Sequence, residues 1–300
     1  MTARTPIIVF GGSGFVGQHL VPALVQAGHR VVIPTRGDGS ADATPHVKRR
    51  SGDVYDPAFL REVLRGAHAV INLVGILNEK GDDGLGFQRV FVELPDLIMA
   101  AMHDGGVRRL LQMSALHADD GASNYLKARG RAERHVRASG LDWTLFRASV
   151  IAGPGDGLFN RFDALLRVAP ALPVGRADAR FQPVWVGDVA RAFVQALQDD
   201  ATLGQSYDLV GPRVVTLREI IEHTARARGR HRAVIALPHA LGKLQADVGE
   251  YLPGKPISRD NWRSLQQDST SDDDGLAKLG ITRVDPLERL PEILGIGGDA

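Results

Sequence analysis

Residues 7–17 read Ile7-Ile8-Val9-Phe10-Gly11-Gly12-Ser13-Gly14-Phe15-Val16-Gly17, an apolar run that ends in closely spaced glycines. Two glycine patterns overlap in this run. One is G-x-x-G-x-x-G, formed by Gly11, Gly14 and Gly17, and the other is G-x-G-x-x-G, formed by Gly12, Gly14 and Gly17. Such spacing lets a backbone approach a pyrophosphate at the N-terminus of a helix. We therefore predict a strand, a tight turn and a helix, in which the stretch from Gly11 to Gly17 binds a dinucleotide.

The segment after the turn supports this prediction. Gln18 to Ala27 carries apolar side chains at Leu20, Val21, Leu24 and Val25, which share one helix face. A glycine pattern alone is a weak signal, but one placed between a Val/Ile-rich strand and an amphipathic helix is specific. A glycine turn without a ligand remains the alternative interpretation.

Composition excludes several classes of function. The chain has 300 residues, of which 44% are hydrophobic and 24% charged, enough for one large domain or two smaller ones. Its net charge of +1 provides no overall field for nucleic acid or an anionic membrane. The absence of cysteine rules out thiol nucleophiles, disulfides and thiolate metal sites, and the histidines show no metal-ligand spacing. With no signal peptide and no long uncharged apolar stretch, we expect a cytoplasmic protein.

Predicted strands and helices alternate along the first half of the chain. Such alternation, with strands apolar on both faces, is typical of an α/β fold with a doubly wound parallel sheet of the Rossmann type. We predict strands at 30–34, 47–51, 69–74, 107–113 and 143–147, and helices at 57–65, 87–103 and 123–139. This pattern places a dinucleotide-binding domain at residues 1–155.

Beyond residue 155 the pattern becomes irregular and prolines punctuate short helical pieces. We expect a smaller, mixed C-terminal lobe over 156–300. It is interleaved with the first domain, because residues 180–212 return to the sheet through a predicted helix at 188–197 and a predicted strand at 205–210. Thr216-Leu217-Arg218-Glu219 forms a capping box that opens a helix. We expect the last helix to begin at Asp272-Asp273-Asp274 and to stop at Gly280.

The end of the second predicted strand indicates which dinucleotide binds. An NAD site places a carboxylate there to accept hydrogen bonds from the ribose, but this strand ends in Ile33-Pro34-Thr35-Arg36. The guanidinium of Arg36 suits a phosphate, which favours NADP(H) over NAD(H). The alternative is an exposed arginine, with Asp38 as a late carboxylate. Asp53, followed by Val54, is either an acceptor for the adenine amino group or a turn residue.

Candidate catalytic groups follow the fifth strand. Tyr125 and Arg129 lie one turn apart on a predicted helix and therefore share a face. In this arrangement the cation stabilises a phenolate, although arginine itself cannot exchange a proton. Ser114 ends a strand, where its hydroxyl could polarise a substrate carbonyl above the sheet. Each of these residues could equally serve an ordinary core or turn role.

These motifs occur in an order that resembles a known family. The chain resembles the short-chain dehydrogenase/reductase superfamily. The resemblance is carried by the glycine turn, Asn72-Leu73-Val74-Gly75, Ser114, Tyr125 with Arg129 and Glu133, and residues 146–156. Residues 70–76 and 180–190 are similar to its atypical extended branch, which includes the nucleotide-binding accessory subunit of complex I and bacterial NAD-dependent epimerase/dehydratase relatives. The resemblance covers about residues 6–210 well.

The resemblance implies a Rossmann domain with a substrate lobe and a bound NADPH. It also implies that Val74 and Gly75 contact the cofactor, that Tyr125 is the proton donor or acceptor, and that Ser114 contacts the carbonyl. The chain departs from the family pattern at Arg129, where a lysine is usual, and at Ala115, where many members have a second serine.

Two functions are compatible with these residues. The first is an NADP(H)-dependent oxidoreductase or epimerase-like enzyme that acts on a carbonyl or quinone. The second is a non-catalytic accessory or sensor protein that contacts a partner through its C-terminal lobe. The segment 238–244 and the basic stretch 226–232 offer a weak peripheral contact with the inner face of a membrane or with a respiratory complex, or else form a solvated surface.

Overall fold

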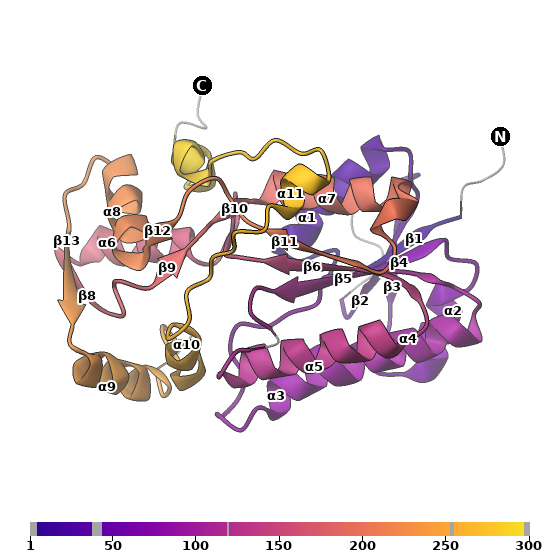
Figure 1. Ribbon diagram of the computed structural model, residues 1–300, viewed down its shortest axis with the longest axis horizontal. Coiled ribbons are helices and arrows are strands. Elements are labelled where there is room, and N and C mark those ends of the chain that lie inside the picture. The colour runs from indigo at the N-terminus through magenta and orange to yellow at the C-terminus, as the bar shows by residue number, and fades with distance from the viewer. Residues whose placement is uncertain (1–4, 38–43, 119, 253–254, 297–300) are drawn as a thin grey trace.

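A seven-stranded parallel sheet forms the centre of the molecule (Figure 1). The structure is a computed structural model that describes residues 5–37, 44–118, 120–252 and 255–296. The strands are β1 (Ile7–Phe10), β2 (Val31–Thr35), β3 (Val47–Ser51), β4 (Ala69–Asn72), β5 (Arg109–Ala115), β6 (Asp142–Ala148) and β11 (Gln205–Leu209). They lie in the order β11-β6-β5-β4-β1-β2-β3. The chain reverses its direction of winding between β1 and β4, so the predicted doubly wound α/β fold is confirmed.

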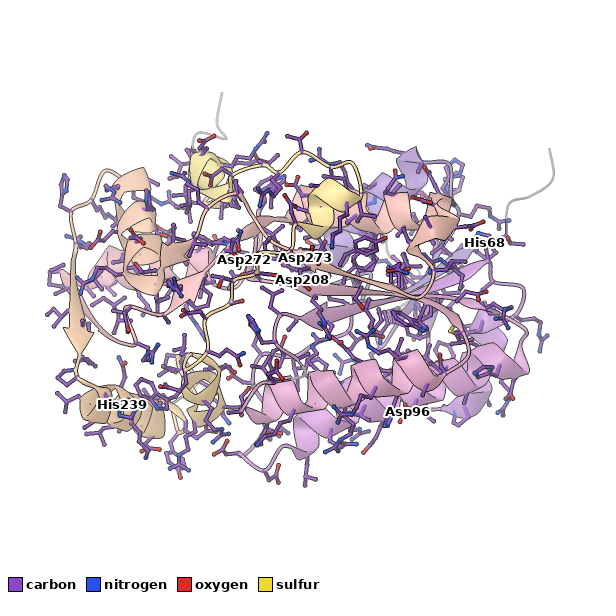
Figure 2. All side chains as sticks on the ribbon, viewed as in Figure 1. His68, Asp96, Asp208, His239, Asp272 and Asp273 are labelled. Carbon is purple, nitrogen blue, oxygen red and sulfur yellow. The ribbon has the colours of Figure 1, made fainter. Side chains whose placement is uncertain are left out.

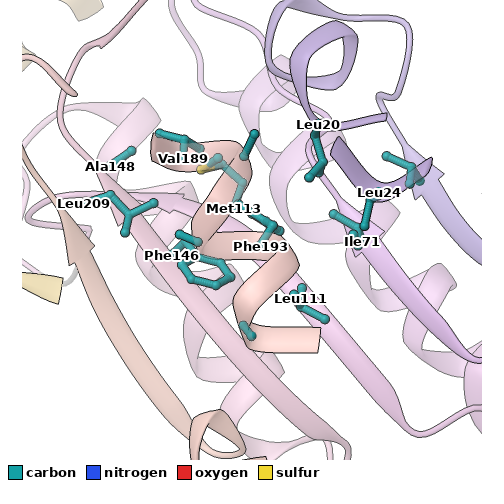
Figure 3. Close-up of a cluster of buried hydrophobic side chains, with 14 of the residues drawn as sticks. Leu20, Leu24, Ile71, Leu111, Met113, Phe146, Ala148, Val189, Phe193 and Leu209 are labelled. Atoms are coloured by element: carbon teal, nitrogen blue, oxygen red, sulfur yellow. The ribbon is translucent and has the colours of Figure 1, made fainter. Parts of the chain in front are cut away.

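Helices cover both faces of the sheet. On one face lie α1 (Phe15–Gln26) and α7 (Val186–Gln198), which pack on each other and on the strands. Figure 3 shows the cluster of buried side chains between them, where Leu20, Leu24 and Phe193 meet Phe146 and Ile71 of the sheet. All five side chains are buried, since the apolar faces of the two helices pack against strands that are apolar on both faces.

The opposite face is covered by α2 (Pro57–Leu64), α4 (Leu94–Asp104) and α5 (Asn124–Ala138). The helix predicted over 87–103 is present, but part of it is π-helical. It consists of α3 (Leu85–Gln88), a π-helical segment (Arg89–Glu93) and α4 without a break. The π turn adds a residue to the helical repeat and changes the direction in which the side chains before it point.

The second region packs against the carboxyl end of the sheet. Its parallel pair β8 and β13 and its short pairs β7–β10 and β9–β12 are joined by helices that enclose two small apolar clusters. Its elements are β7 (Ile151–Ala152), α6 (Phe159–Val168), β8 (Ala171–Gly175), β9 (Arg180–Phe181), β10 (Val184–Trp185), β12 (Val215–Thr216), α8 (Leu217–Ala227), β13 (Ala233–Leu237), α9 (His239–Gly249), α10 (Arg259–Ser264), η3 (Pro286–Arg289) and α12 (Leu290–Ile293). Two other short elements, η2 (Asp200–Thr202) and α11 (Gly275–Lys278), pack on β11 of the main sheet. The capping box at Thr216 is present as predicted.

The segment after α10 returns to the edge strand of the main sheet. Figure 2 shows Asp272 and Asp273 beside Asp208 of β11, and the Ser271 hydroxyl donates a hydrogen bond of 2.6 Å to the Asp208 carboxylate. The expectation that the last helix ends at Gly280 was wrong, because η3 and α12 follow it. They were missed because prolines at the start of each interrupt the helical pattern.

Candidate functional site

The glycine turn adopts a backbone that only glycine accommodates at key positions. Gly11 has φ +78°, in the left-handed region. A Cβ atom at Gly17 would lie 2.5 Å from the backbone of Gly11 and Gly12, closer than any real contact. These two constraints bring the start of α1 directly against the end of β1, as dinucleotide binding requires.

The first turn of α1 has no side-chain cap among the described residues. Its N-cap, Gly14, has no side chain that could satisfy the amides of Phe15, Val16 and Gly17, and no acidic residue occupies the first turn. Side chains of Asp56, Ser123 and Thr216 cap α2, α5 and α8, whereas the N-cap residues of α6, α7 and α9 resemble that of α1 in making no side-chain cap. An uncapped helix start behind a glycine turn fits the pyrophosphate of a dinucleotide, because its amides and helix dipole favour an anion.

The ends of β1 and β4 join this turn to the predicted catalytic residues. A Cβ at Gly11 would lie 3.1 Å from the backbone of Leu73 and Val74, just beyond β4. One residue further, a Cβ at Gly75 would lie 3.2 Å from Nη2 of Arg129. The glycine turn, the backbone of 73–75 and Arg129 therefore form a continuous series of contacts at the switch point of the sheet, where α/β folds bind ligands.

Tyr125 and Arg129 share a face of α5, as their spacing predicts. The guanidinium carbon of Arg129 lies 3.9 Å from the centre of the Phe91 ring and 5.4 Å from that of Tyr125. The Tyr125 ring in turn packs edge-on against Phe87 and Phe91, at centroid distances of 5.8 and 5.3 Å. Phe91 thus holds both candidate residues from the π-helical segment.

Arg129 carries a buried positive charge with one nitrogen unused. The residue is 7% exposed, and its Nη1 donates a hydrogen bond of 2.8 Å to the Met113 carbonyl at the end of β5. Its Nε is buried and has no hydrogen-bond partner among the described residues. A cation placed between Gly75 and Tyr125 with a free donor fits a polar group of a bound dinucleotide, such as a ribose hydroxyl.

Ser114 has contacts that do not support its expected role. It is 5% exposed, and its hydroxyl donates a hydrogen bond of 2.6 Å to the Glu133 carboxylate. Glu133 is also held by Arg147 through bonds of 2.9 and 3.0 Å. The single proton of the Ser114 hydroxyl is therefore committed to a buried carboxylate, and it is not available to polarise a substrate carbonyl.

The other predicted cofactor residues lie at the ends of β2 and β3. Arg36 is exposed and directly follows β2, while Asp38 lies outside the described residues. Asp53 follows β3 and accepts a hydrogen bond of 2.9 Å from the Tyr55 amide, so its contacts are those of the turn residue. Val54 packs partly buried against the apolar cluster under α2. Both retain a place at the carboxyl edge of the sheet.

Sequence patterns missed two parts of this site. The first part is the contact of Phe91 with Arg129, which depends on the π turn. The signal that could have revealed it is the spacing of Phe87 and Phe91, which lie four positions apart in an apolar stretch. The second part is Asp260, whose carboxylate accepts hydrogen bonds from the amides of Asn124 and Tyr125. Nothing in the local sequence of Asp260 indicates this contact.

The two segments considered for a membrane contact are separate. The basic stretch 226–232 precedes β13 and α9 follows it, so they lie at opposite ends of a strand about 16 Å long (Figure 1). Within α9 and the residues after it, Leu241, Leu244 and Tyr251 are exposed by 50%, 56% and 77%. Among the described residues, no helix is long and apolar enough to cross a membrane.

Comparison with known proteins identifies the family of the chain. Residues 11–168 match a family described as NAD(P)H-binding. The NADH dehydrogenase [ubiquinone] 1 alpha subcomplex subunit 9 of Arabidopsis thaliana is 30% identical, over 95% of this chain and 74% of that protein. A ceramide reductase of Caulobacter vibrioides is 28% identical, over 88% of this chain and 80% of that protein.

A solved structure shows the same fold. The UDP-glucose 4-epimerase of Thermotoga maritima superimposes with a TM-score of 0.76 at 16% identity, over 97% of this chain and 98% of that one. Fold similarity at this identity carries no information about substrate. Together with the match over residues 11–168 and the glycine turn, these relationships place the chain in the NAD(P)H-binding family of the extended short-chain dehydrogenase/reductase type.

Proposed function

We propose that this protein is an NADP(H)-dependent oxidoreductase that reduces a carbonyl or quinone group, with Tyr125 as the proton donor. The single observation that carries the proposal is the continuous series of contacts from the glycine turn through Gly75 and Arg129 to Tyr125. It brings an acid and a fixed cation to the switch point of the sheet, where the reactive end of a dinucleotide lies in this fold.

The residues divide the work as follows. The uncapped start of α1 would hold the pyrophosphate, and Val74 and Gly75 would contact the nicotinamide half. When bound, the reduced cofactor supplies a hydride to the substrate carbon. Tyr125 gives its phenolic proton to the substrate oxygen, so that a carbonyl becomes an alcohol, and Arg129 stabilises the phenolate that remains. Ser114 has no part in this scheme, because its hydroxyl is bonded to Glu133.

The choice of NADP(H) rests on Arg36. Arg36 is exposed and directly follows β2. An arginine near this strand end can accommodate the 2′-phosphate of NADP in this fold, which supports the proposal. Support for reduction comes from relatives named as reductases, the ceramide reductase of Caulobacter vibrioides among them. Ceramide-related lipids that carry a carbonyl group are therefore the first compounds to assay, followed by short aldehydes and quinones.

The test is hydride transfer from 4-deuterated NADPH to a panel of such compounds, followed by mass spectrometry of the alcohol. Tyr125→Phe should lower kcat about 100-fold, because it removes the proton donor and keeps the ring. Tyr251→Phe is the matched control, since Tyr251 is 77% exposed and lies outside the site. Unchanged turnover in Tyr125→Phe would exclude this mechanism.

A second candidate is an accessory role in which the dinucleotide is structural. The observation that favours it is the exposed apolar face of α9, where Leu241, Leu244 and Val248 are each at least half exposed. Such a face is typical of a protein contact, and relatives such as the Arabidopsis protein are named as subunits of NADH dehydrogenase. This role predicts that purified protein retains NADPH without turnover. Binding to anionic vesicles would instead identify the face as a peripheral membrane contact.

A further inference from the structure

Asp260 belongs to the second region of the molecule, but its carboxylate contacts the first turn of α5. One oxygen accepts a hydrogen bond from the Asn124 amide at 2.7 Å, and the other accepts one from the Tyr125 amide at 3.1 Å. Tyr125 and Asp260 are 135 positions apart in sequence. Asp260 is 3% exposed, so water does not compete for these bonds.

The first turn of α5 depends on this carboxylate. The first amides of a helix have no acceptor within the helix itself. The Ser123 hydroxyl accepts from Leu126 at 3.1 Å and the Ser123 carbonyl accepts from Lys127 at 3.0 Å. The amides of Asn124 and Tyr125 are left to Asp260. Its negative charge also lies at the end of α5 where the helix dipole favours an anion.

Asp260 is itself held in place by Arg263, which also contacts the loop after β4. Nη2 of Arg263 donates to its carboxylate at 2.8 Å, and the same guanidinium pairs with Asp82 in the loop after β4. The hydrogen bond from Arg263 keeps the pKa of Asp82 below its ordinary value. Nearby, the Lys255 ammonium donates to the Glu79 carbonyl at 2.7 Å. Residues 255–263 therefore hold both the loop after β4 and the start of α5.

The base of this arrangement is rigid. Trp262, two positions after Asp260 on α10, is 6% exposed, and its ring lies so close to α9 that a Cβ at Gly242 would be 2.7 Å from it. A Cβ at Gly175 of β8 would lie 2.8 Å from the same ring. With Trp262 fixed between α9 and β8, the position of Asp260 is set by the packing of the second region.

We infer that Asp260 is a positioning residue, through which the second region sets where the phenol of Tyr125 lies relative to Arg129. The inference rests on the proposed function only in that Tyr125 is the proton donor. Displacement of α10, as by a substrate bound in the second region, would move Tyr125 at its backbone. A loss of either hydrogen bond should loosen the first turn of α5 and leave its later turns intact.

The experiment labels the protein with 3-fluorotyrosine and records the ¹⁹F NMR spectrum. The chain has four tyrosines, and Tyr125→Phe identifies the resonance of Tyr125. In Asp260→Asn the side-chain amide can accept only one of the two bonds. The Tyr125 resonance should shift or broaden, and amide exchange in a peptide covering 123–128 should become about tenfold faster. The resonances of Tyr55 and Tyr207 should stay in place.

Two further variants make the result decisive. Asp247→Asn is the matched control, because it removes the ion pairs of Asp247 with Lys243 and Arg259 and leaves both hydrogen bonds from α5 to Asp260 in place, so the Tyr125 resonance should not change. Asn124→Pro removes one donor to Asp260 without altering Asp260, since proline is accepted at the first position of a helix. It should shift the Tyr125 resonance even if Asp260→Asn fails to fold.

An unchanged Tyr125 resonance and unchanged exchange in both Asp260→Asn and Asn124→Pro would overturn the inference. Neither readout requires turnover, so this failure is distinct from failure of the proposed function. A different outcome is that Tyr125→Phe reduces carbonyls at the wild-type rate while Asp260→Asn shifts the Tyr125 resonance. This result would support the positioning contact and would contradict the assignment of Tyr125 as proton donor. If both hold, kcat of Asp260→Asn should fall about 10- to 100-fold with little change in the KM for NADPH.

Discussion

The guanidinium carbon of Arg129 lies 5.4 Å from the centre of the Tyr125 ring, one helical turn earlier on α5. The side chain of Phe91 lies against both residues, and Arg129 reaches the Met113 carbonyl with Nη1. The cation is thus fixed by a ring on one side and a strand end on the other. A fixed cation beside a phenol stabilises the charged form of that phenol when the proton leaves.

Replacement of Arg129 should therefore affect turnover more than binding. We expect Arg129→Met to lower kcat about 100-fold, because the phenolate would lose the cation that Arg129 places beside it. Arg129→Lys should keep more activity, although an ammonium cannot both stack on Phe91 and reach Met113. The pH dependence of kcat in NADPH oxidation measures this effect. Arg131→Met, at an exposed position on the same helix, should behave as the wild type.

Gly17 should tolerate no side chain. In Gly17→Ala the new Cβ would overlap the backbone of Gly11 and Gly12, so that α1 must move away from β1. We expect the free energy of unfolding to fall by about 1 to 3 kcal/mol and NADPH binding to be lost. Urea unfolding and calorimetric titration measure the two effects. Gly157→Ala, where the nearest atom lies at 3.8 Å, is the control, and equal losses in both variants would contradict the explanation.

Arg36 should determine the preference between the two cofactors. We expect Arg36→Ala to weaken NADPH about 10- to 100-fold and to leave NADH unchanged, because only NADPH carries the 2′-phosphate. Calorimetric titration of the cofactor-stripped protein gives both dissociation constants. Arg50→Ala is the control, since the side chain of Arg50 forms an exposed ion pair with Glu62. Equal weakening of both cofactors in Arg36→Ala would show that Arg36 does not recognise the phosphate.

Asp163 should make the protein sensitive to acid. Burial by itself raises the pKa of this carboxyl, but hydrogen bonds from Arg228 and Arg167 outweigh burial and hold the pKa below its ordinary value. Because the folded-state pKa is lowered, the stability that Asp163 contributes is fully present above about pH 4 and is lost as the pH falls through the folded value.

The variant Asp163→Asn tests this expectation. It should lower the free energy of unfolding at pH 7 by about 3 kcal/mol, because two arginines would lose a buried partner. Below about pH 4 the difference from the wild type should shrink. Urea unfolding at several pH values measures both. Glu62→Gln, which removes only an exposed ion pair, should change stability by less than about 1 kcal/mol, and a pH-independent effect of Asp163→Asn would refute the electrostatic explanation.

The sequence by itself determined the architecture of the sheet and the place of the cofactor turn. Strands and helices are encoded by side chains close together in the chain, through apolar periodicity, and β3 was predicted with the same limits that the structure shows. The turn at Gly11 was equally local, because a positive φ and a close approach require glycine itself. The pairing of Tyr125 with Arg129 followed from helical spacing alone.

Only the tertiary structure decided which side chains meet across the molecule. Ser114 was expected to face substrate, but its hydroxyl donates a hydrogen bond to Glu133, which the packing of α5 on β6 brings together with Arg147. Asp260 reaches Tyr125 because α10 packs against the start of α5. Such contacts depend on how distant segments fold onto each other, and no periodicity or motif in one segment carries that information.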